Sequence, residues 1–254
     1  MNTSETTKVA IITGASKGIG LAMVQKLILM GYHVYGVCRN PENCLFQHEN
    51  FQLDKVDITN LTQLEAWVKS FKSFNGIELL IHNAGVGYFA PMEELNWNQI
   101  QEMISLHITA PMLITNSLLR KLKENKGRIF LIGSVAGTKV SPWGSVYGST
   151  KAGLLHFGRE LFQELRKSSV KVTNIIPDLT KTEFYEHLDF ETDEDPNSYL
   201  LADCIANALE NILTQRSGTV ITEIVIQPEI FRIRKKKQNL PLSFAILGLI
   251  EVLR

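Results

Sequence analysis

A tyrosine and a lysine four positions apart, Tyr147 and Lys151, have the clearest capacity for chemistry, and Ser134 precedes the tyrosine by thirteen residues. A phenol with a pKa of about 10 is a poor acid or base at neutral pH. A helix places positions i and i+4 on one face, so the Lys151 ammonium would lie beside the Tyr147 hydroxyl and lower its pKa. Ser134 would then hydrogen-bond a substrate oxygen. The trio predicts a proton donor for carbonyl chemistry, although a Tyr/Lys pair by itself is more typical of an ordinary helix surface.

A glycine-rich turn near the N-terminus is the second signal. The apolar run from Val9 to Ile12 is typical of a buried strand, and Leu21 to Met30 continues as an apolar helix. Between them, Thr13–Gly20 has the sequence TGASKGIG. Such a turn presents backbone N–H groups and the positive end of a helix dipole to phosphates. The spacing differs from the common G-x-G-x-x-G fingerprint, so a simple strand–helix turn is the alternative interpretation.

Together these residues resemble the short-chain dehydrogenase/reductase family, and the resemblance extends from about Lys8 to Pro228. The motifs follow the family's order: the Thr13–Gly20 turn, Asp57, Asn83-Ala84-Gly85, Ser134, Tyr147-x-x-x-Lys151, and Pro177 followed by Thr182. In that family the tyrosine is the catalytic acid/base. The lysine lowers its pKa and holds the nicotinamide ribose, and the serine orients the substrate carbonyl. The resemblance therefore implies these catalytic roles for Tyr147, Lys151 and Ser134.

The resemblance also implies a nicotinamide cofactor site. The expected cofactor-binding residues are Gly14, Ser16, Lys17, Gly18, Ile19, Gly20, Arg39, Asp57, Ile58, Asn83, Ala84, Gly85, Tyr147, Lys151, Pro177 and Thr182. Asp57 would contact the adenine. No metal is expected, because tyrosine and serine would polarise the substrate oxygen.

Cofactor choice depends on the end of the second predicted strand. NAD-selective folds place an acidic residue there for the ribose 2′-OH, whereas a nearby arginine accommodates the 2′-phosphate of NADP. This chain has Cys38 at the acidic position, Arg39 directly after it, and Lys17 inside the glycine turn. Both cations would attract a 2′-phosphate, so NADP(H) is predicted.

The chain departs from the family pattern at two positions. His107 stands where the family has an asparagine that holds an active-site water linked to the lysine. A histidine can donate and accept hydrogen bonds, so His107 is a candidate catalytic residue in a proton relay, with a buried structural histidine as the alternative. Asp178 follows Pro177 where the family has glycine, and this change is expected to reshape the nicotinamide pocket.

Strands alternate with helices along the chain, which predicts an α/β fold: a single-domain, Rossmann-like, doubly wound parallel sheet with helices on both faces. The predicted strands are Val9–Ile12, His33–Val37, Phe51–Lys55, Leu79–His82, Arg128–Ile132, Lys171–Ile176 and Thr219–Ile226. The predicted helices are Ile19–Leu29, Leu61–Lys72, Trp97–Lys123, Val146–Arg166 and Leu200–Leu213. Residues 1–254 are expected to form one domain.

Composition narrows the range of partners and compartments. The chain has 26 basic and 26 acidic residues, which gives no reason to expect a nucleic-acid partner. Three cysteines without metal-ligand spacing are typical of reduced thiols, and the polar start of the chain does not resemble a signal peptide. A cytoplasmic protein is predicted, forming a homodimer or homotetramer as family members commonly do. Apolar positions that suit such an interface are Leu154, Phe157, Leu161, Phe162 and Leu165.

Two segments lie outside the motifs. Residues 179–199 form a polar connection with several acidic residues, and the family closes its substrate site with the corresponding segment. Residues 229–254 combine a basic run from Phe231 to Lys237 with a mostly apolar stretch from Leu240 to Leu253. The apolar stretch is too short to span a bilayer, so packing on protein is predicted, with a peripheral membrane contact as the alternative.

These observations predict an NADPH-dependent carbonyl reductase or alcohol dehydrogenase. A hydride would pass between the nicotinamide and a small-molecule carbonyl or alcohol carbon, while Tyr147 exchanges the proton. The alternative is an NADP-binding regulatory or sensor protein with little turnover, which the departures at His107 and Asp178 keep open.

Overall fold

The computed structural model describes residues 7–140 and 142–236, and its centre is a parallel sheet of seven strands. The strands are β1 (Val9–Thr13), β2 (His33–Cys38), β3 (Phe51–Lys55), β4 (Ile77–His82), β5 (Arg128–Ile132), β6 (Lys171–Pro177) and β8 (Glu223–Ile226). Their order is β3-β2-β1-β4-β5-β6-β8, and every neighbouring pair is parallel. The strand order changes direction between β1 and β4, which confirms the predicted doubly wound, Rossmann-like fold.

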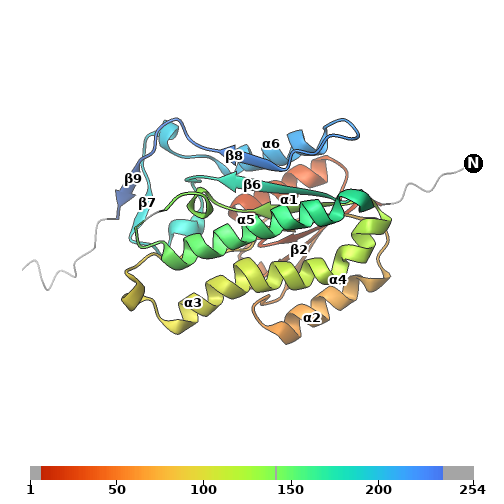
Figure 1. The fold of residues 1–254 in the computed structure, drawn as a ribbon, viewed down its shortest axis with the longest axis horizontal. Helices are drawn as coiled ribbons and strands as arrows, with labels where there is room; N and C mark the ends of the chain where they lie inside the picture. Colours follow the sequence, from red (N-terminus) through yellow and green to blue (C-terminus); the bar gives the residue numbers. More distant parts are fainter. Residues whose placement is uncertain (1–6, 141, 237–254) are drawn as a thin grey trace, which may run out of the picture.

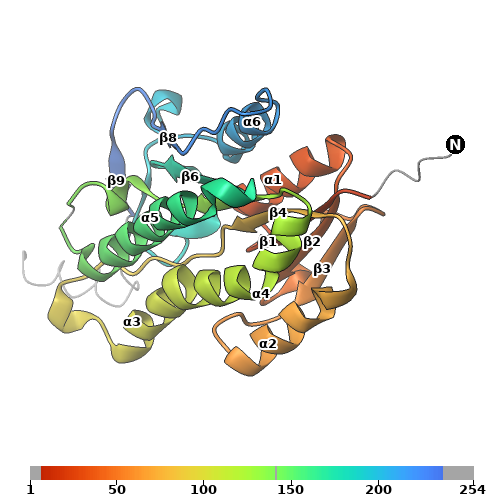
Figure 2. The same cartoon turned by 45° about the vertical axis from the view of Figure 1, so that its right-hand side comes forward.

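Helices cover both faces of the sheet (Figures 1 and 2). Helices α1 (Gly18–Leu29) and α6 (Ala202–Leu213) pack on one face, and α2 (Leu61–Ser70), α4 (Ala110–Glu124) and α5 (Ser145–Leu165) pack on the other. Alternate residues of β1 enter the two cores, with Ala10 and Ile12 on the α1 side and Ile11 on the α5 side. Every residue of β1 is buried, which explains why a central parallel strand has a continuous apolar sequence.

The helix predicted over Trp97–Lys123 is divided into three parts. Helix α3 (Trp97–Ile104) begins at an Asn96–Gln99 capping box, and α4 begins at Ala110. Between them, Ser105–Thr109 forms a π-helical turn. Pro111 lies at the start of α4 and has no backbone N–H, so the carbonyl of His107 loses the α-helical donor four residues ahead. The turn therefore widens at the position of the unusual histidine.

The largest differences from the prediction lie near the C-terminus. Strand β8 begins at Glu223 rather than Thr219, and α6 begins at Ala202 rather than Leu200. Two further strands, β7 (Phe190–Thr192) and β9 (Ile233–Lys235), form a separate antiparallel pair that the sequence did not predict. Each has three residues, and their partners lie far apart in sequence, so no local alternation marks them. The β7–β9 pair lies apart from the main sheet, at the left of the view in Figure 1.

The prediction that five apolar positions of α5 suit a subunit interface needs a correction. Leu154, Leu161 and Leu165 are buried within the chain's own core, so they are not available for a subunit interface. Phe157 and Phe162 are only partly buried. The oligomeric state itself stays a prediction.

The basic and apolar C-terminal extension is described only as far as residue 236. The predicted apolar segment, Leu240 to Leu253, therefore lies outside the described residues. Within residues 7–140 and 142–236, no helix combines the length and apolar character needed to cross a bilayer.

Candidate active site

The carboxyl ends of the parallel strands open onto a cavity of about 1040 Å³. The glycine turn after β1, the end of β2, the segments after β3, β4, β5 and β6, and residues of β7 and β9 line this cavity. Every predicted site residue lines it except His107, which lies behind the cavity wall. The structure thus brings the glycine turn and the Ser134/Tyr147/Lys151 trio, which are far apart in sequence, into one space.

The glycine turn is tied to the end of β4 by Asn83. The Asn83 side-chain amide donates to the carbonyls of Thr13 and Gly14 at 3.0 and 2.9 Å. The Thr13 hydroxyl oxygen accepts from the backbone N–H groups of Asn83 and Ala84, both at 3.1 Å. A Cβ on Gly20 would lie 1.9 Å from the Gly14 carbonyl oxygen, so only glycine permits this close approach. The turn brings the N-terminus of α1 to the cavity, where it can bind an anion.

The proposed acid/base trio lies between β5 and α5. Tyr147 and Lys151 lie on α5 and are both buried, and Ser134 precedes a short 3₁₀ turn after β5. The Lys151 ammonium donates to the Ile132 carbonyl at 3.0 Å, and its Nζ lies 5.9 Å from the centroid of the Tyr147 ring. The i, i+4 spacing therefore places the two side chains on one face, as predicted.

The direction of the Tyr147 pKa shift corrects the sequence-based expectation. Burial raises the pKa of Tyr147 to about 12, and a hydrogen bond with Ser134 only partly opposes this rise. Burial also lowers the pKa of Lys151 to about 8. The lysine shares a helix face with the tyrosine, but burial is the largest cause of the shift in the tyrosine pKa. At neutral pH, Tyr147 is therefore protonated and able to donate a proton.

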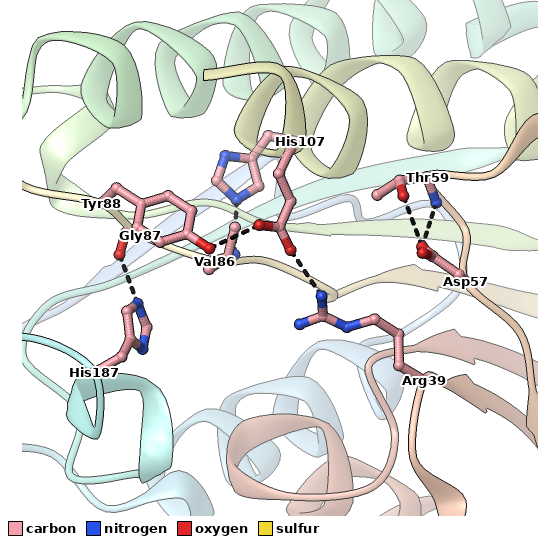
Figure 3. Close-up of polar contacts among 9 residues, drawn as sticks. Arg39, Asp57, Thr59, Val86, Gly87, Tyr88, His107 and His187 are labelled. Atoms are coloured by element: carbon pink, nitrogen blue, oxygen red, sulfur yellow. Dashed lines mark hydrogen bonds and ion pairs between the residues drawn. The ribbon is translucent and has the colours of Figure 1, made fainter. Parts of the chain in front are cut away.

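His107 lies in the π-helical turn, and both of its ring nitrogens are engaged by the protein; Figure 3 shows the contact with Val86. Its Nε2 accepts from the Val86 backbone N–H at 3.3 Å, which leaves the proton on Nδ1 for the Thr150 hydroxyl oxygen at 2.8 Å. The Thr150 hydroxyl in turn donates to the Tyr147 carbonyl at 2.9 Å. Burial, followed by the charge of Lys151, lowers the pKa of His107 well below its usual range. This geometry favours the structural alternative over a water-binding relay.

The two cations expected to bind a 2′-phosphate have acidic partners. The Arg39 guanidinium lies 2.8 Å from a carboxylate oxygen of Glu102 on α3, and the other oxygen accepts from the Tyr88 hydroxyl at 2.7 Å (Figure 3). Lys17 lies 3.7 Å from Glu186. The sequence analysis missed Glu102, because nothing in the local pattern of α3 indicates that it reaches the end of β2.

Two aspartates at the cavity have internal partners. Asp57 accepts from the backbone N–H and the hydroxyl of Thr59 at 2.9 and 2.7 Å, which fixes the turn after β3 (Figure 3). Asp178 accepts from the Leu179 N–H at 2.9 Å and from the Gln227 amide at 2.8 Å. The second departure from the family pattern therefore joins the segment after β6 to the segment after β8.

The sequence analysis also missed a cluster of aromatic side chains at the cavity. Five rings form a closed cycle of neighbours, with centroid distances of 4.9, 5.4, 5.8, 5.4 and 6.0 Å in the order Tyr147, Phe89, Phe190, Tyr185, Phe184 and back to Tyr147. Three of them come from the 179–199 segment, for which the sequence analysis noted the acidic residues and the expected closure over the substrate but not the aromatic residues. The aromatic content of that segment was the signal available.

The acidic 179–199 segment and the basic C-terminal run pair with each other. Arg234 on β9 contacts Glu191 at 2.7 Å and also pairs with Glu194, and Arg232 lies 3.6 Å from Asp195. The Lys236 ammonium donates to the backbone carbonyls of Tyr185 and Glu186. These contacts hold β9 against β7 beside the cavity. The sequence analysis did not predict them, because it considered the acidic segment and the basic run separately.

Comparison with known proteins agrees with the geometry. A sequence model described as short chain dehydrogenase matches residues 8–192. An uncharacterised oxidoreductase of Staphylococcus epidermidis is 32% identical over 227 residues, which cover 87% of this chain and 97% of the relative. Serine 3-dehydrogenase of Rhizobium radiobacter is 30% identical, with 86% of this chain and 92% of the relative covered.

A solved structure of similar fold is the alcohol dehydrogenase of the archaeon Thermococcus sibiricus, complexed with 5-hydroxy-NADP. It has a TM-score of 0.79 and 25% identity, and the match covers 89% of this chain and 98% of that protein. The fold is thus shared with a dehydrogenase, and the family model spans most of the described residues. The chain belongs to the short-chain dehydrogenase family of oxidoreductases.

Proposed function

We propose that this oxidoreductase is an NADPH-dependent carbonyl reductase or alcohol dehydrogenase. The observation that carries the proposal is the meeting of the Tyr147/Lys151/Ser134 trio and the glycine turn in one cavity. The similarity to an alcohol dehydrogenase complexed with an NADP derivative and to a serine 3-dehydrogenase supports the same reaction class.

The residues present fit a bound dinucleotide. Gly14 and Gly18 have φ values of +70° and +54°, and Gly20 allows α1 to pack closely against the Gly14 carbonyl, so the turn keeps its shape at the cavity. The Thr13–Gly20 turn and the N-terminus of α1 would hold the pyrophosphate, and Arg39 with Lys17 would hold the 2′-phosphate. When bound, NADPH supplies a hydride for transfer to an electrophilic carbon.

The chain's own residues would manage the proton and the substrate oxygen. Protonated Tyr147 would donate its phenolic proton to the carbonyl oxygen as the carbon accepts the hydride, so a carbonyl becomes an alcohol. The Ser134 hydroxyl would hydrogen-bond the same oxygen and so position it beside Tyr147. Lys151, with a pKa of about 8, stays mostly charged at neutral pH and would stabilise the tyrosinate that forms.

The test is a screen of carbonyl and alcohol compounds that follows NADPH absorbance. We expect oxidation of NADPH with at least one carbonyl compound by the wild-type protein, and greatly reduced oxidation by Tyr147→Phe. Cofactor binding without turnover of any compound would contradict the enzyme assignment and favour the regulatory alternative.

A further inference from the structure

The substrate side of the cavity is surrounded by aromatic side chains. The five-ring cycle described above includes the proposed acid Tyr147, and the other four rings come from three different segments. Phe89 follows β4, Phe184 and Tyr185 lie in the 3₁₀ turn Glu183–Tyr185, and Phe190 begins β7. All five rings line the cavity. A carbonyl group that reaches Tyr147 therefore carries its substituents into an aromatic environment.

The rim of the same cavity exposes large apolar side chains. Trp143 is 55% exposed on the segment before α5, whereas Phe231 and Ile233 are 70% and 50% exposed near β9. Val140, on the same segment as Trp143, is fully exposed. All four line the cavity. Apolar side chains gathered at one opening are a feature of ligand-binding surfaces, because a bound apolar group would remove them from water.

The backbone conformation of Trp143 is a second indication that the rim of the cavity binds a ligand. Its φ of +59° is in the left-handed region, which a bulky side chain rarely adopts. Its carbonyl accepts from the Ala90 N–H at 3.1 Å, which joins the rim to the segment that carries Phe89. Strained positions of this kind are concentrated at ligand-binding sites.

The charged groups near the aromatic cycle are exposed to solvent or already have partners in the protein. The cavity lining near the rings also includes four exposed charged residues, Lys139, Glu183, Asp189 and Lys235, of which Lys235 is paired opposite Phe190. The Asp178 carboxylate is engaged by Leu179 and Gln227. Lys151 is buried, and its ammonium donates to the Ile132 carbonyl. Around the aromatic cycle, the described residues offer apolar surface and hydroxyl groups rather than a buried ion pair for a charged substrate.

Building on the proposed function, we propose that the substrate is a ketone, or its secondary alcohol, that carries a bulky aromatic or alicyclic group. The carbonyl would lie at Tyr147 and Ser134, and the apolar group would extend along the aromatic cycle to Trp143 and Phe231 at the rim. Reduction adds the hydride of NADPH to the carbonyl carbon and the Tyr147 proton to its oxygen, giving the alcohol and NADP⁺. The β7–β9 pair supports this specificity, because it joins the strand that begins at Phe190 to the strand that begins at Ile233, and both residues line the cavity.

The test compares butanone, acetophenone, 2-acetonaphthone and 4-acetylbenzoate with NADPH and the full-length chain. We expect kcat/KM to be at least about tenfold higher for 2-acetonaphthone than for butanone, because an apolar group of this size contacts several rings. Phe190→Ala and Phe231→Ala should each lower that ratio by about fivefold or more. Leu29→Ala removes an apolar side chain that is 83% exposed at the end of α1, and it should leave the ratio unchanged.

A ratio near one in the wild-type protein would overturn the proposal while leaving the reductase assignment intact. A preference of tenfold or more for 4-acetylbenzoate over acetophenone would also overturn it, because the rim lysines would then dominate. If Phe190→Ala does not fold, Phe190→Leu keeps the volume without the ring and should still lower the ratio.

If no ketone is turned over, the reductase assignment fails and the binding of 1-(2-naphthyl)ethanol, measured by calorimetry with NADP⁺ present, still decides the inference. Weaker binding in Phe190→Ala than in Leu29→Ala would support it, and equal binding would overturn it.

Discussion

The two ends of the cavity are built in different ways. The cofactor end consists mainly of backbone and short side chains at the ends of buried strands, with Asn83 and Thr13 joining β1 to β4. The substrate end consists of large side chains on segments beyond the sheet, and exposed ion pairs such as Arg234–Glu191 hold them together. Larger side chains cannot be accommodated easily at the cofactor end. At the substrate end, side chains can be substituted without disturbing the sheet.

This difference has an energetic basis. At the cofactor end, an added methyl group at Gly20 would collide with the backbone, so the constraint is steric. At the substrate end, exposed ion pairs contribute little individually and are screened by salt. This difference between the ends favours proteins that keep the same cofactor chemistry while their substrates differ.

Removing the proposed acid should have the largest effect on activity. Tyr147→Phe keeps the ring in the aromatic cycle but removes the proton, so kcat should fall by about 10²–10⁴-fold. NADPH affinity, measured by fluorescence titration, should remain close to that of the wild type. Tyr32→Phe removes a phenol hydroxyl far from the cavity and serves as the control. Retention of near wild-type kcat in Tyr147→Phe would remove this residue from the mechanism.

Gly20→Ala tests the steric constraint at the cofactor end. Its Cβ would lie 1.9 Å from the Gly14 carbonyl oxygen and 2.6 Å from the Asn83 amide nitrogen. We expect loss of NADPH binding and a decrease of about 1–3 kcal/mol in the free energy of unfolding, or more. Phe231→Ala at the substrate end should change that free energy by no more than about 0.5 kcal/mol. Equal destabilisation of the two variants in urea unfolding would contradict the proposed difference between the ends.

Charge substitutions at the end of β2 test cofactor selectivity. Arg39→Gln should weaken NADPH binding by about tenfold or more and NADH binding far less, because a charge-assisted hydrogen bond contributes about 1.5–3 kcal/mol. Glu102→Gln should strengthen NADPH binding, because the 2′-phosphate then no longer competes with a carboxylate for Arg39. Parallel titrations with both cofactors measure the two effects. Identical affinities for NADPH and NADH in the wild type would refute the selectivity.

The buried histidines should make stability depend on pH. Burial lowers the pKa of His82 to about 3 and that of His107 well below its usual range. Below pH 6.5 the unfolded state then binds more protons than the folded state, so stability falls as the pH falls. His107→Asn should reduce this slope by up to about 1.4 kcal/mol per pH unit. Urea unfolding between pH 4.5 and pH 7 is the measurement.

The same variant distinguishes a structural His107 from a proton relay. A neutral, internally hydrogen-bonded His107 predicts no acid limb in kcat that depends on this residue. Loss of an acid limb near pH 6.5 in His107→Asn, with an unchanged stability slope, would restore the relay role.

The sequence predicted the cofactor end more completely than the substrate end, for a physical reason. Strand β1, the glycine turn and α1 are contiguous in sequence. Their apolar residues indicate which positions are buried, and their glycines indicate where backbone segments approach closely. Tyr147 and Lys151 lie on one helix, so their proximity followed from helical spacing. In contrast, the β7–β9 pair and the Arg39–Glu102 contact join distant segments, which no local pattern specifies.

The spacing of residues in the sequence also did not predict how deeply the Tyr147 and His107 side chains are buried. The i, i+4 relation predicted a lowered Tyr147 pKa, but desolvation of the ring raises it instead. Likewise, the identity of His107 allowed a relay role, and only the positions of Val86 and Thr150 show that both ring nitrogens are engaged.

Transfer of deuterium from NADPH labelled at C4 of the nicotinamide tests the central claim most directly. The wild-type protein is incubated with each of the two C4-labelled stereoisomers and the best carbonyl substrate from the screen, and the product is analysed by mass spectrometry and NMR. We predict an alcohol with one deuterium on the former carbonyl carbon from one stereoisomer only, and greatly slowed formation of this product by Tyr147→Phe. Oxidation of NADPH that leaves no deuterium in the alcohol would contradict the account.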